Sequence, residues 1–328
     1  MKIKIDPFLI ALVGAVAIAT VLPCRGAFVP IAGGVTTAVV AMLFFLHGAK
    51  LSRQAIWDGG KAWRVHALAL TATFVMFPLI GLALAGLVNG VLSPSIGAGI
   101  VFLCLLPSTV QSSIAFTAIS GGNVPAAICS ASASNLMGVL ATPLMVHLFL
   151  GREGHGSFMS SLTNIALLLL LPFVVGHLLR RWLSPILSRH KRLVGVVDRG
   201  AILLVVYTAF SAAVVHGLWR TLSVEDLVWV LVLDGLILAI ALVATTMIAR
   251  RMQLSTADEI AAVFCGSKKS LASGVPMASV LFPAALVGPV IMPLMIFHQM
   301  QLMACALLAG RYAAGASRRL TVTEIVAP

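Results

Sequence analysis

Two adjacent lysines, Lys268 and Lys269, are the residues with the clearest potential for chemistry. They stand in CGSKKSLASG (265–274), a stretch that is otherwise small or apolar and lies in a long hydrophobic region. A charged side chain at the centre of a bilayer costs roughly 2.5–3.5 kcal/mol, so two such side chains need a compensating role. A buried ammonium group can act as a fixed cation, carry a proton or bind an anion. These three roles are the alternatives for the pair.

A second polar group lies in the runs LLPSTVQSS (105–113) and SASASN (130–135). Pro107 predicts a break in the first run, because proline has no backbone N–H and interrupts a helix. The hydroxyl and amide oxygens of both runs form a candidate site for a cation or a polar solute. Its members are Ser108, Thr109, Gln111, Ser112, Ser113, Ser130, Ser132, Ser134 and Asn135. The lysine stretch adds Ser267 and Ser270 to this set.

The composition indicates the kind of element that carries these residues. Of the 328 residues, 60% are hydrophobic and 10% are charged, whereas a soluble domain has about 25% charged residues. Apolar runs of about 20 residues, each long enough to cross a bilayer as a helix, recur along the chain. Runs such as Leu167–Leu171 lack the alternation of a membrane β-strand. We therefore expect an all-α polytopic membrane protein without a soluble domain.

Several other classes of protein are disfavoured. The net charge is +12, and an excess of Lys and Arg is typical of membrane proteins, which carry these residues in their cytoplasmic loops. No run combines basic and aromatic residues as a nucleic-acid site would, so a nucleic-acid-binding protein is disfavoured. HExxH, GxSxG and paired intramembrane aspartates are absent from the sequence, so we expect no enzyme. The five cysteines form no CxxC, so neither a disulfide framework nor a zinc site is expected. No cofactor is predicted, and a passive channel is a minor alternative.

We predict ten membrane spans, the first of them uncleaved. They cover approximately 7–23, 30–50, 65–88, 95–120, 124–149, 158–179, 200–219, 227–249, 258–281 and 284–310. The fourth and ninth spans are predicted to be broken, at LLPSTVQSS and at GSKKS. Seventeen Lys and Arg residues fall on one side of this topology, against Arg25, Arg152 and Arg220 on the other. The asymmetry places both termini, including a tail at 311–328, in the cytoplasm, as expected for a protein of the inner membrane.

The two halves of the chain also resemble each other. SIAFT (113–117) is echoed by SLASG (270–274), PAA (125–127) by PAA (283–285), and PLMV (143–146) by PLMI (293–296). Five spans in each half give the halves opposite orientations. Inverted repeats (7–150 and 158–310) with a broken helix in each half are typical of secondary transporters, whose sites lie near the midplane.

The same motifs carry a family resemblance that covers essentially the whole chain. LLPSTVQSS (105–113), SASASNLMGVLATPLM (130–145), FCGSKKSLASGVPMA (264–278) and LLAGR (307–311) resemble the bile acid:sodium symporter superfamily. The resemblance is closer to the divergent branch that includes vertebrate member 7 of solute carrier family 10. It implies a six-helix core domain with crossed broken helices 4 and 9, a four-helix panel domain and alternating access. It also places His298 and Gln299 near the substrate cavity.

The chain departs from the sodium-coupled members of that superfamily. Those members carry an acidic residue before the break of helix 9, where this chain reads VFCGS (263–267). They carry amides after the break, where this chain has Lys268 and Lys269, and Ser113 stands where an asparagine is familiar. Sodium coupling therefore cannot be inferred for this chain from the resemblance, and no other metal is expected.

Two placements are open from the sequence. Residues 271–310 contain no charged residue and could hold two short spans, which would put the lysines at the cytoplasmic surface and leave Ile260–Cys265 as an interfacial segment. Asp234, the one acid well inside a span, is interpreted as a lysine partner, a proton carrier or a residue at the lipid interface.

The sequence predicts a secondary active transporter, one unit over residues 1–328, favoured as a monomer. Its partners would be the bilayer and a small organic solute, anionic or amphipathic, moved by alternating access with a lysine in place of a sodium ion. The alternatives are a proton-coupled exchanger that uses an intramembrane lysine, and a sodium-coupled organic anion symporter as in the wider family.

Overall fold

A computed structural model of the protein describes residues 7–50, 61–88, 90–151, 163 and 166–326. Within these ranges the chain is helical and contains no strand. The first half comprises α1 (Pro7–Val21), α2 (Phe28–Lys50), α4 (Trp63–Thr71), the π-helical turn η1 (Ala72–Met76), α5 (Phe77–Leu87), α6 (Pro94–Leu105), α7 (Gln111–Ile119) and α8 (Val124–Leu150). The second half comprises η3 (Ala166–Leu170), α10 (Leu171–Leu178), α11 (Arg180–Arg189), α12 (Lys191–Val215), α13 (Leu218–Thr221), α14 (Val224–Arg251), α15 (Thr256–Gly266), α16 (Leu271–Leu281) and α17 (Ala284–Val326).

Six of the described helical stretches are long and apolar enough to cross a membrane, or seven if a bent pair counts as one span. They are Phe28–Lys50, Trp63–Leu87, Val124–Leu150, Arg192–Val215, Val224–Arg251 and Ala284–Ala314, with Leu167–Leu178 plus Arg180–Arg189 as the bent pair. Large apolar side chains such as Leu87, Leu148 and Val243 are exposed on these helices, as lipid contact requires. The all-helical membrane architecture is confirmed, whereas the count of ten spans stays a prediction.

Both predicted interruptions fall where helices stop. After α6, Leu106 is extended (φ −78°, ψ 156°), because the residue before a proline is disfavoured in the helical region. The helix restarts at Gln111, the first residue of α7. In the second half α15 ends at Gly266, and Ser270 caps α16 by accepting a hydrogen bond from the Ser273 N–H at 3.2 Å. The chain is therefore non-helical at 106–110 and at 267–270.

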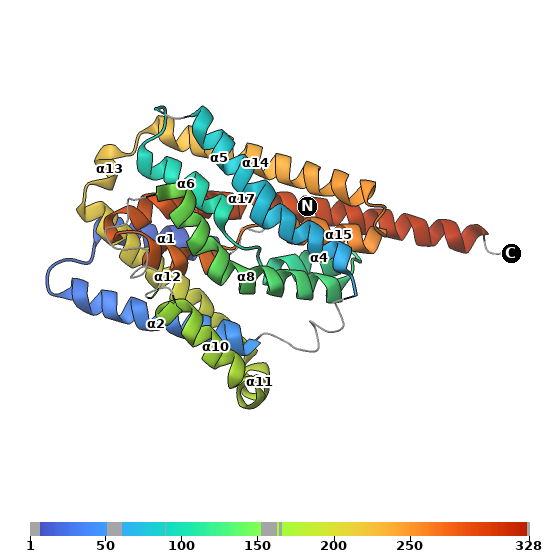
Figure 1. Ribbon diagram of the computed structural model, residues 1–328, viewed down its shortest axis with the longest axis horizontal. Coiled ribbons are helices and arrows are strands. Elements are labelled where there is room, and N and C mark those ends of the chain that lie inside the picture. Colours follow the sequence, from blue (N-terminus) through green and yellow to red (C-terminus); the bar gives the residue numbers. More distant parts are fainter. Residues whose placement is uncertain (1–6, 51–60, 89, 152–162, 164–165, 327–328) are drawn as a thin grey trace.

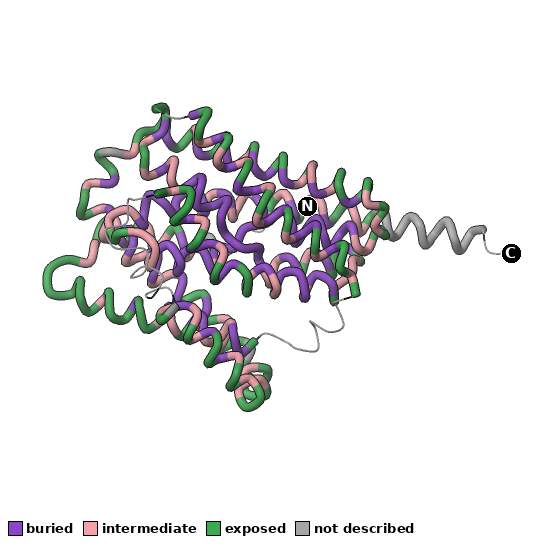
Figure 2. The backbone as a smooth tube through the Cα atoms, in the orientation of Figure 1, coloured by how far each residue is buried: buried purple, intermediate pink, exposed green. Residues whose placement is uncertain are grey.

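The helices form two groups that meet at α12 (Figure 1). In one group α2 packs against α10, α11 and α12, and α1 packs against α12. In the other group α6 packs against α5 and α17, and α15 packs against α4, α7, α8 and α14. Helix α12 also contacts α16 and α17 and so joins the groups. Figure 2 shows that the buried backbone concentrates in the second group, while α2 and α11 are mostly exposed or intermediate.

Two helices are longer than their predicted spans. Helix α12 begins at Lys191, about two turns before the predicted start at residue 200, so Arg192, Asp198 and Arg199 lie on a helix rather than in a loop. A hydropathy window detects only the apolar part of a helix, and this helix continues into polar sequence. Helix α17 continues to Val326, through most of the predicted tail. The loop charges Lys2, Lys4, Arg53 and Arg152 lie outside the described residues.

Helices α2 and α10 approach each other through a pair of glycines. A Cβ added at Gly48 would meet the carbonyl of Phe173, and one added at Gly176 would meet the carbonyl of Phe45. Both obstacles are backbone atoms, which cannot rotate away. The two glycines therefore set the distance between these helices.

We predict that Gly48→Ala lowers the thermal stability of the detergent-purified protein. The expected cost is about 1–3 kcal/mol, typical of overpacking at a close contact. Gly34→Ala is the matched control on the same helix, since a Cβ there has nothing within 4 Å. Equal melting temperatures for the two variants would contradict the glycine contact.

Candidate functional site

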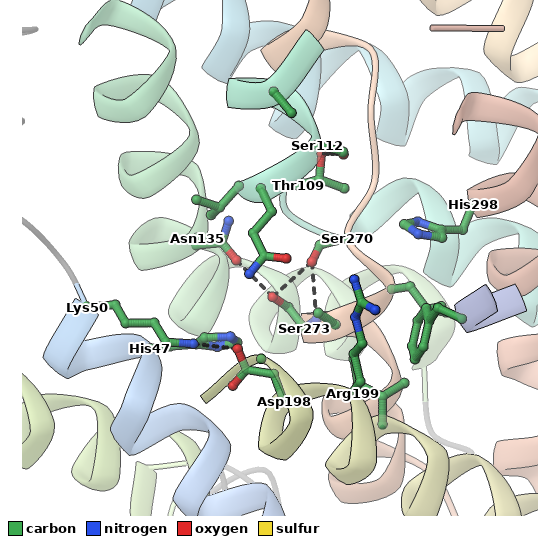
Figure 3. A pocket seen from close by; sticks show the side chains of 18 of the residues that line it. His47, Lys50, Thr109, Ser112, Asn135, Asp198, Arg199, Ser270, Ser273 and His298 are labelled. Atoms are coloured by element: carbon green, nitrogen blue, oxygen red, sulfur yellow. Dashed lines mark hydrogen bonds and ion pairs between the residues drawn. The ribbon is translucent and has the colours of Figure 1, made fainter. Parts of the chain in front are cut away.

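A cavity of about 800 Å³ lies between the two groups of helices. One wall comes from the segments around the helix breaks, with Thr109, Gln111, Ser112, Ser132, Asn135, Ser270 and Ser273, and is extended by His298 of α17. The opposite wall comes from α1, α2, α10 and α12. Figure 3 shows side chains from both walls pointing into the same space. The breaks thus supply hydroxyl and amide groups to one side of a cavity large enough for a small organic molecule.

The N-termini of two short helices also face this cavity. Thr109, Val110, Gln111 and Ser112 line it at the start of α7, and Ser270, Leu271, Ala272 and Ser273 line it at the start of α16. Free backbone N–H groups and the helix dipole make such termini electropositive. This wall therefore favours negative charge although no lysine or arginine side chain lines it.

The opposite wall is charged. The Lys50 ammonium of α2 forms an ion pair with the Asp198 carboxylate of α12, and Arg192, Arg199 and His47 line the cavity beside them. The Arg199 guanidinium lies over the Phe8 ring, 5.7 Å from its centroid. Lys50, Arg192 and Arg199 carry three positive charges against one carboxylate. Sequence reasoning missed this wall, because it counted these basic residues as loop charges.

Lys269 is completely buried, with 0% of its surface exposed. Its Nζ donates hydrogen bonds to three backbone carbonyls, those of Thr73 (2.9 Å), Cys104 (2.8 Å) and Leu106 (2.7 Å). Nζ also lies 4.2 Å from the centroid of the Phe77 ring, a distance suited to a cation–π contact. All three N–H donors of the ammonium group are therefore used, and the charge is held by oxygen dipoles and an aromatic face.

The local backbone explains why these carbonyls are available. In η1 the Phe77 N–H bonds to Ala72 O, and the next residue, Pro78, has no N–H to offer Thr73 O. At the end of α6 the Ser108 N–H bonds to Ser134 Oγ at 3.0 Å, which leaves Cys104 O without its usual helical partner. Leu106 O lies in the break itself. Two prolines, Pro78 and Pro107, thus help to create the acceptors that Lys269 uses.

Lys268 is equally buried but differently surrounded. Among the described residues its Nζ makes one long hydrogen bond, to Ser112 Oγ at 3.4 Å. It lies 4.6 Å from the centroid of the Phe116 ring and 5.4 Å from that of Phe264. Ser112 lines the cavity, so Lys268 is one side chain away from it. The competing placement of the lysines at the surface is wrong, and the segment Ile260–Cys265 is buried in α15 rather than interfacial.

The two breaks bond to each other. Ser108 Oγ donates to Cys265 O at 2.5 Å and Ser113 Oγ donates to Phe264 O at 2.8 Å, at the end of α15. In return, the Ser270 N–H donates to Pro107 O at 2.9 Å. Helix ends leave backbone groups without partners, and in a membrane protein these groups must be satisfied internally. Each break therefore completes the hydrogen bonding of the other.

Two amides extend this network. Asn135 Nδ2 donates to Ser108 O at 2.7 Å, while its Oδ1 accepts from Ser273 Oγ at 2.8 Å. Gln301 of α17 accepts from the Lys269 N–H at 2.8 Å and donates to Lys269 O at 2.9 Å. Gln301 Nε2 also lies 2.8 Å from His298 Nδ1. The sequence predicted His298 for the site, and Gln301 belongs to the same polar stretch of α17, one turn further along.

The remaining predicted residues lie outside the cavity lining. Ser130 Oγ contacts His66 Nδ1 at 2.6 Å, and Ser267 Oγ, directly after α15, donates to Val263 O of that helix. Gln299 is half-buried on α17 and is not part of the lining. Asp234 is 0% exposed, and neither of its carboxyl oxygens has a hydrogen-bond partner among the described residues. Its interpretations as a lipid-interface residue and as a direct lysine partner are therefore wrong.

The described residues contain no group of three or more His, Cys, Asp or Glu side chains that could hold a metal ion. The fold and the site instead define a helical membrane protein with broken helices beside a polar cavity, a class to which secondary transporters belong. Residues 6–314 match the model of the SBF-like CPA transporter family, and the chain belongs to that family.

Three relatives match over nearly their full lengths. The Pseudomonas aeruginosa protein "Uncharacterized protein PA2026" is 55% identical over 94% of this chain and 93% of its own length. The Escherichia coli protein "Putative symporter YfeH" is 50% identical over 94% of this chain and 93% of its own. "Sodium/bile acid cotransporter 7" of Danio rerio is 26% identical over 92% of both chains. The chain is thus similar to symporters, and the resemblance seen in its sequence is confirmed.

We predict that Lys269→Met destabilises the purified protein far more than Lys268→Met. The first variant leaves three buried carbonyls without a donor, at about 1–3 kcal/mol for each unsatisfied group. The second variant removes one long hydrogen bond together with a poorly compensated charge. Thermal unfolding in one detergent compares the pair, and a larger loss for Lys268→Met would refute the different roles assigned to the two ammonium groups.

Proposed function

We propose that the protein is a secondary active transporter of small organic solutes, anionic or amphipathic, that works by alternating access. The observation that carries this proposal is the cavity of about 800 Å³ between two groups of helices. Helix breaks form one wall and an excess of basic side chains forms the other. The membership of the SBF-like CPA transporter family supports the transport activity.

The proposed architecture has ten spans in two inverted repeats. The succession α6, break, α7, α8 in the first half corresponds to α15, break, α16, α17 in the second half. In this arrangement α1, α2, α10 and α12 belong to a panel domain and the remaining long helices to a core domain. Both termini would lie in the cytoplasm of an inner-membrane protein that acts as one transporter unit, favoured as a monomer.

An anionic solute suits the charges of the cavity. The electropositive starts of α7 and α16 face Lys50, Arg192 and Arg199 across the space, and Asp198 already pairs with Lys50. A carboxylate, sulfate or phosphate group would find donors on both walls. Contact with both groups of helices is what a solute needs in order to influence their relative movement.

We further propose that Lys269 takes the place of a sodium ion. Carbonyl oxygens from two helix ends are suitable ligands for a cation, and Lys269 Nζ already binds three of them at 2.7–2.9 Å. The ammonium group is covalently tethered, so its charge stays with the core domain throughout the cycle. A bound sodium ion does not fit this position.

We predict transport without a sodium gradient. A thermal-shift screen of carboxylates, sulfates and phosphates, with NaCl or choline chloride, would first identify a stabilising anion. Its radiolabelled form, with taurocholate as a second probe, would then be offered to proteoliposomes with and without inward sodium. Equal uptake under the two conditions is expected, and uptake that strictly requires sodium would overturn the role of Lys269. Absence of any flux would instead argue against transport.

Lys268 supports a second candidate function, proton-coupled exchange. It is buried, it makes one hydrogen bond of 3.4 Å within the part of the chain that the structure describes, and its partner Ser112 lines the cavity. A lysine side chain beside a polar cavity can bind and release a proton during a transport cycle. Movement of the panel domain could give Lys268 access to water and allow a proton to leave or bind.

If the protein is a proton-coupled exchanger, Lys268→Gln should abolish the pH dependence of flux while substrate binding persists. Solute counterflow between pH 6 and 8 measures the pH dependence, and the thermal-shift assay measures binding of the solute. Arg220→Gln is the control, since Arg220 lies on α13 and not in the cavity lining. An unchanged pH profile in Lys268→Gln would exclude Lys268 as the proton carrier.

A further inference from the structure

Helix α11 (Arg180–Arg189) differs from its neighbours in direction. It follows α10 after a bend of 87°, whereas the preceding stretch Leu167–Leu178 carries no charged residue and belongs to the predicted sixth span. Figure 1 shows α11 at the edge of the molecule, beyond the ends of α2 and α10. A helix perpendicular to a membrane span lies parallel to the membrane surface. This orientation is independent of what the cavity binds.

The residues of α11 divide into two faces. At 100° per residue, Trp182, Leu183, Ile186 and Leu187 share one side of the helix, while Arg180, Arg181, Ser184 and Ser188 share the other. Arg189 ends the helix, and its sequence contains no acidic residue. The helix is thus basic and amphipathic, a pattern typical of helices at a membrane surface.

The protein covers only part of the apolar face. Leu183 and Leu187 are half-buried, and α11 packs against α2, α10 and α12. Trp182 and Ile186 remain 64% and 56% exposed. Exposed tryptophan is enriched where a protein meets the boundary between hydrocarbon and water. The uncovered part of the face is therefore apolar and carries the residue type that is enriched at this boundary.

We propose that α11 binds the anionic phospholipid head groups of the bilayer surface. Its apolar face would enter the boundary of the hydrocarbon, and its arginines would contact lipid phosphates. Three arginines and no acid give the helix a charge complementary to such lipids, and Arg192 near the start of α12 adds a further basic side chain. The 87° bend supplies the matching orientation.

Quenching of tryptophan fluorescence by brominated lipids tests this contact in the full-length protein. Proteoliposomes would contain phosphatidylcholine and phosphatidylglycerol, with bromine on the acyl chains of one lipid or of the other at equal bromine content. The protein has five tryptophans, so the difference between the native protein and Trp182→Phe isolates the signal of Trp182. We expect at least twofold stronger quenching of Trp182 by brominated phosphatidylglycerol than by brominated phosphatidylcholine.

Replacement of Arg180, Arg181 and Arg189 by Gln should remove this preference, whereas Arg220→Gln on α13 should preserve it. Should the triple variant fail to fold, raising NaCl from about 0.05 M to 0.5 M around the native protein should reduce the preference, because salt screens exposed charges. Equal quenching by the two lipids, quenching by neither, or a preference insensitive to salt would overturn the proposal. None of these results depends on solute transport.

Discussion

The hydrogen bonds from Lys269 Nζ to three backbone carbonyls are the interaction on which the centre of the structure depends. They join η1, through Thr73, to the end of α6, through Cys104 and Leu106, and the backbone of Lys269 is held in turn by Gln301 of α17. A positive charge buried without partners would be untenable, and so would three carbonyls without donors. The carbonyls offset the cost of burying the ammonium charge, and the ammonium group supplies the donors that the carbonyls lack. The buried charge and the interruption of the helix therefore depend on each other.

The reciprocal bonds between the breaks have a mechanical consequence. Ser108 and Ser113 bind the end of α15, and Ser270 binds Pro107, so the two non-helical segments are fixed to each other. By contrast, the charged wall of the cavity comes from other helices, of which α12 contacts both groups. A change in cavity shape is therefore easier between the walls than within the wall formed by the breaks. This is the arrangement that movement of one domain against another requires.

The sequence predicted the breaks and singled out the two lysines because both features violate strong rules. A proline in an apolar run and a charge pair in a span each carry a cost that local sequence reveals. The separate roles of Lys268 and Lys269 were not predictable, because spacing places neighbouring side chains about 100° apart but does not say which packs against free carbonyls. The basic wall was also missed, since Arg192 and Arg199 follow polar sequence that ordinarily marks a loop. Their position depends on how far α12 extends and on which helices it packs against.

Pro78 provides one of the three hydrogen-bond acceptors of Lys269 indirectly, by leaving the Thr73 carbonyl without a helical partner. The acceptor at Thr73 exists because the imino acid five residues later has no hydrogen on its nitrogen, and the π-helical turn directs the preceding N–H to Ala72. The Thr73 carbonyl can thus accept a hydrogen bond from the Lys269 ammonium group because Pro78 lacks an N–H. Pro78 lies nearly two hundred positions before Lys269 in the sequence. Restoring that hydrogen would offer the carbonyl a competing donor. Residues 78 and 269 are therefore expected to be energetically coupled through the Thr73 carbonyl, without any need for contact between their side chains.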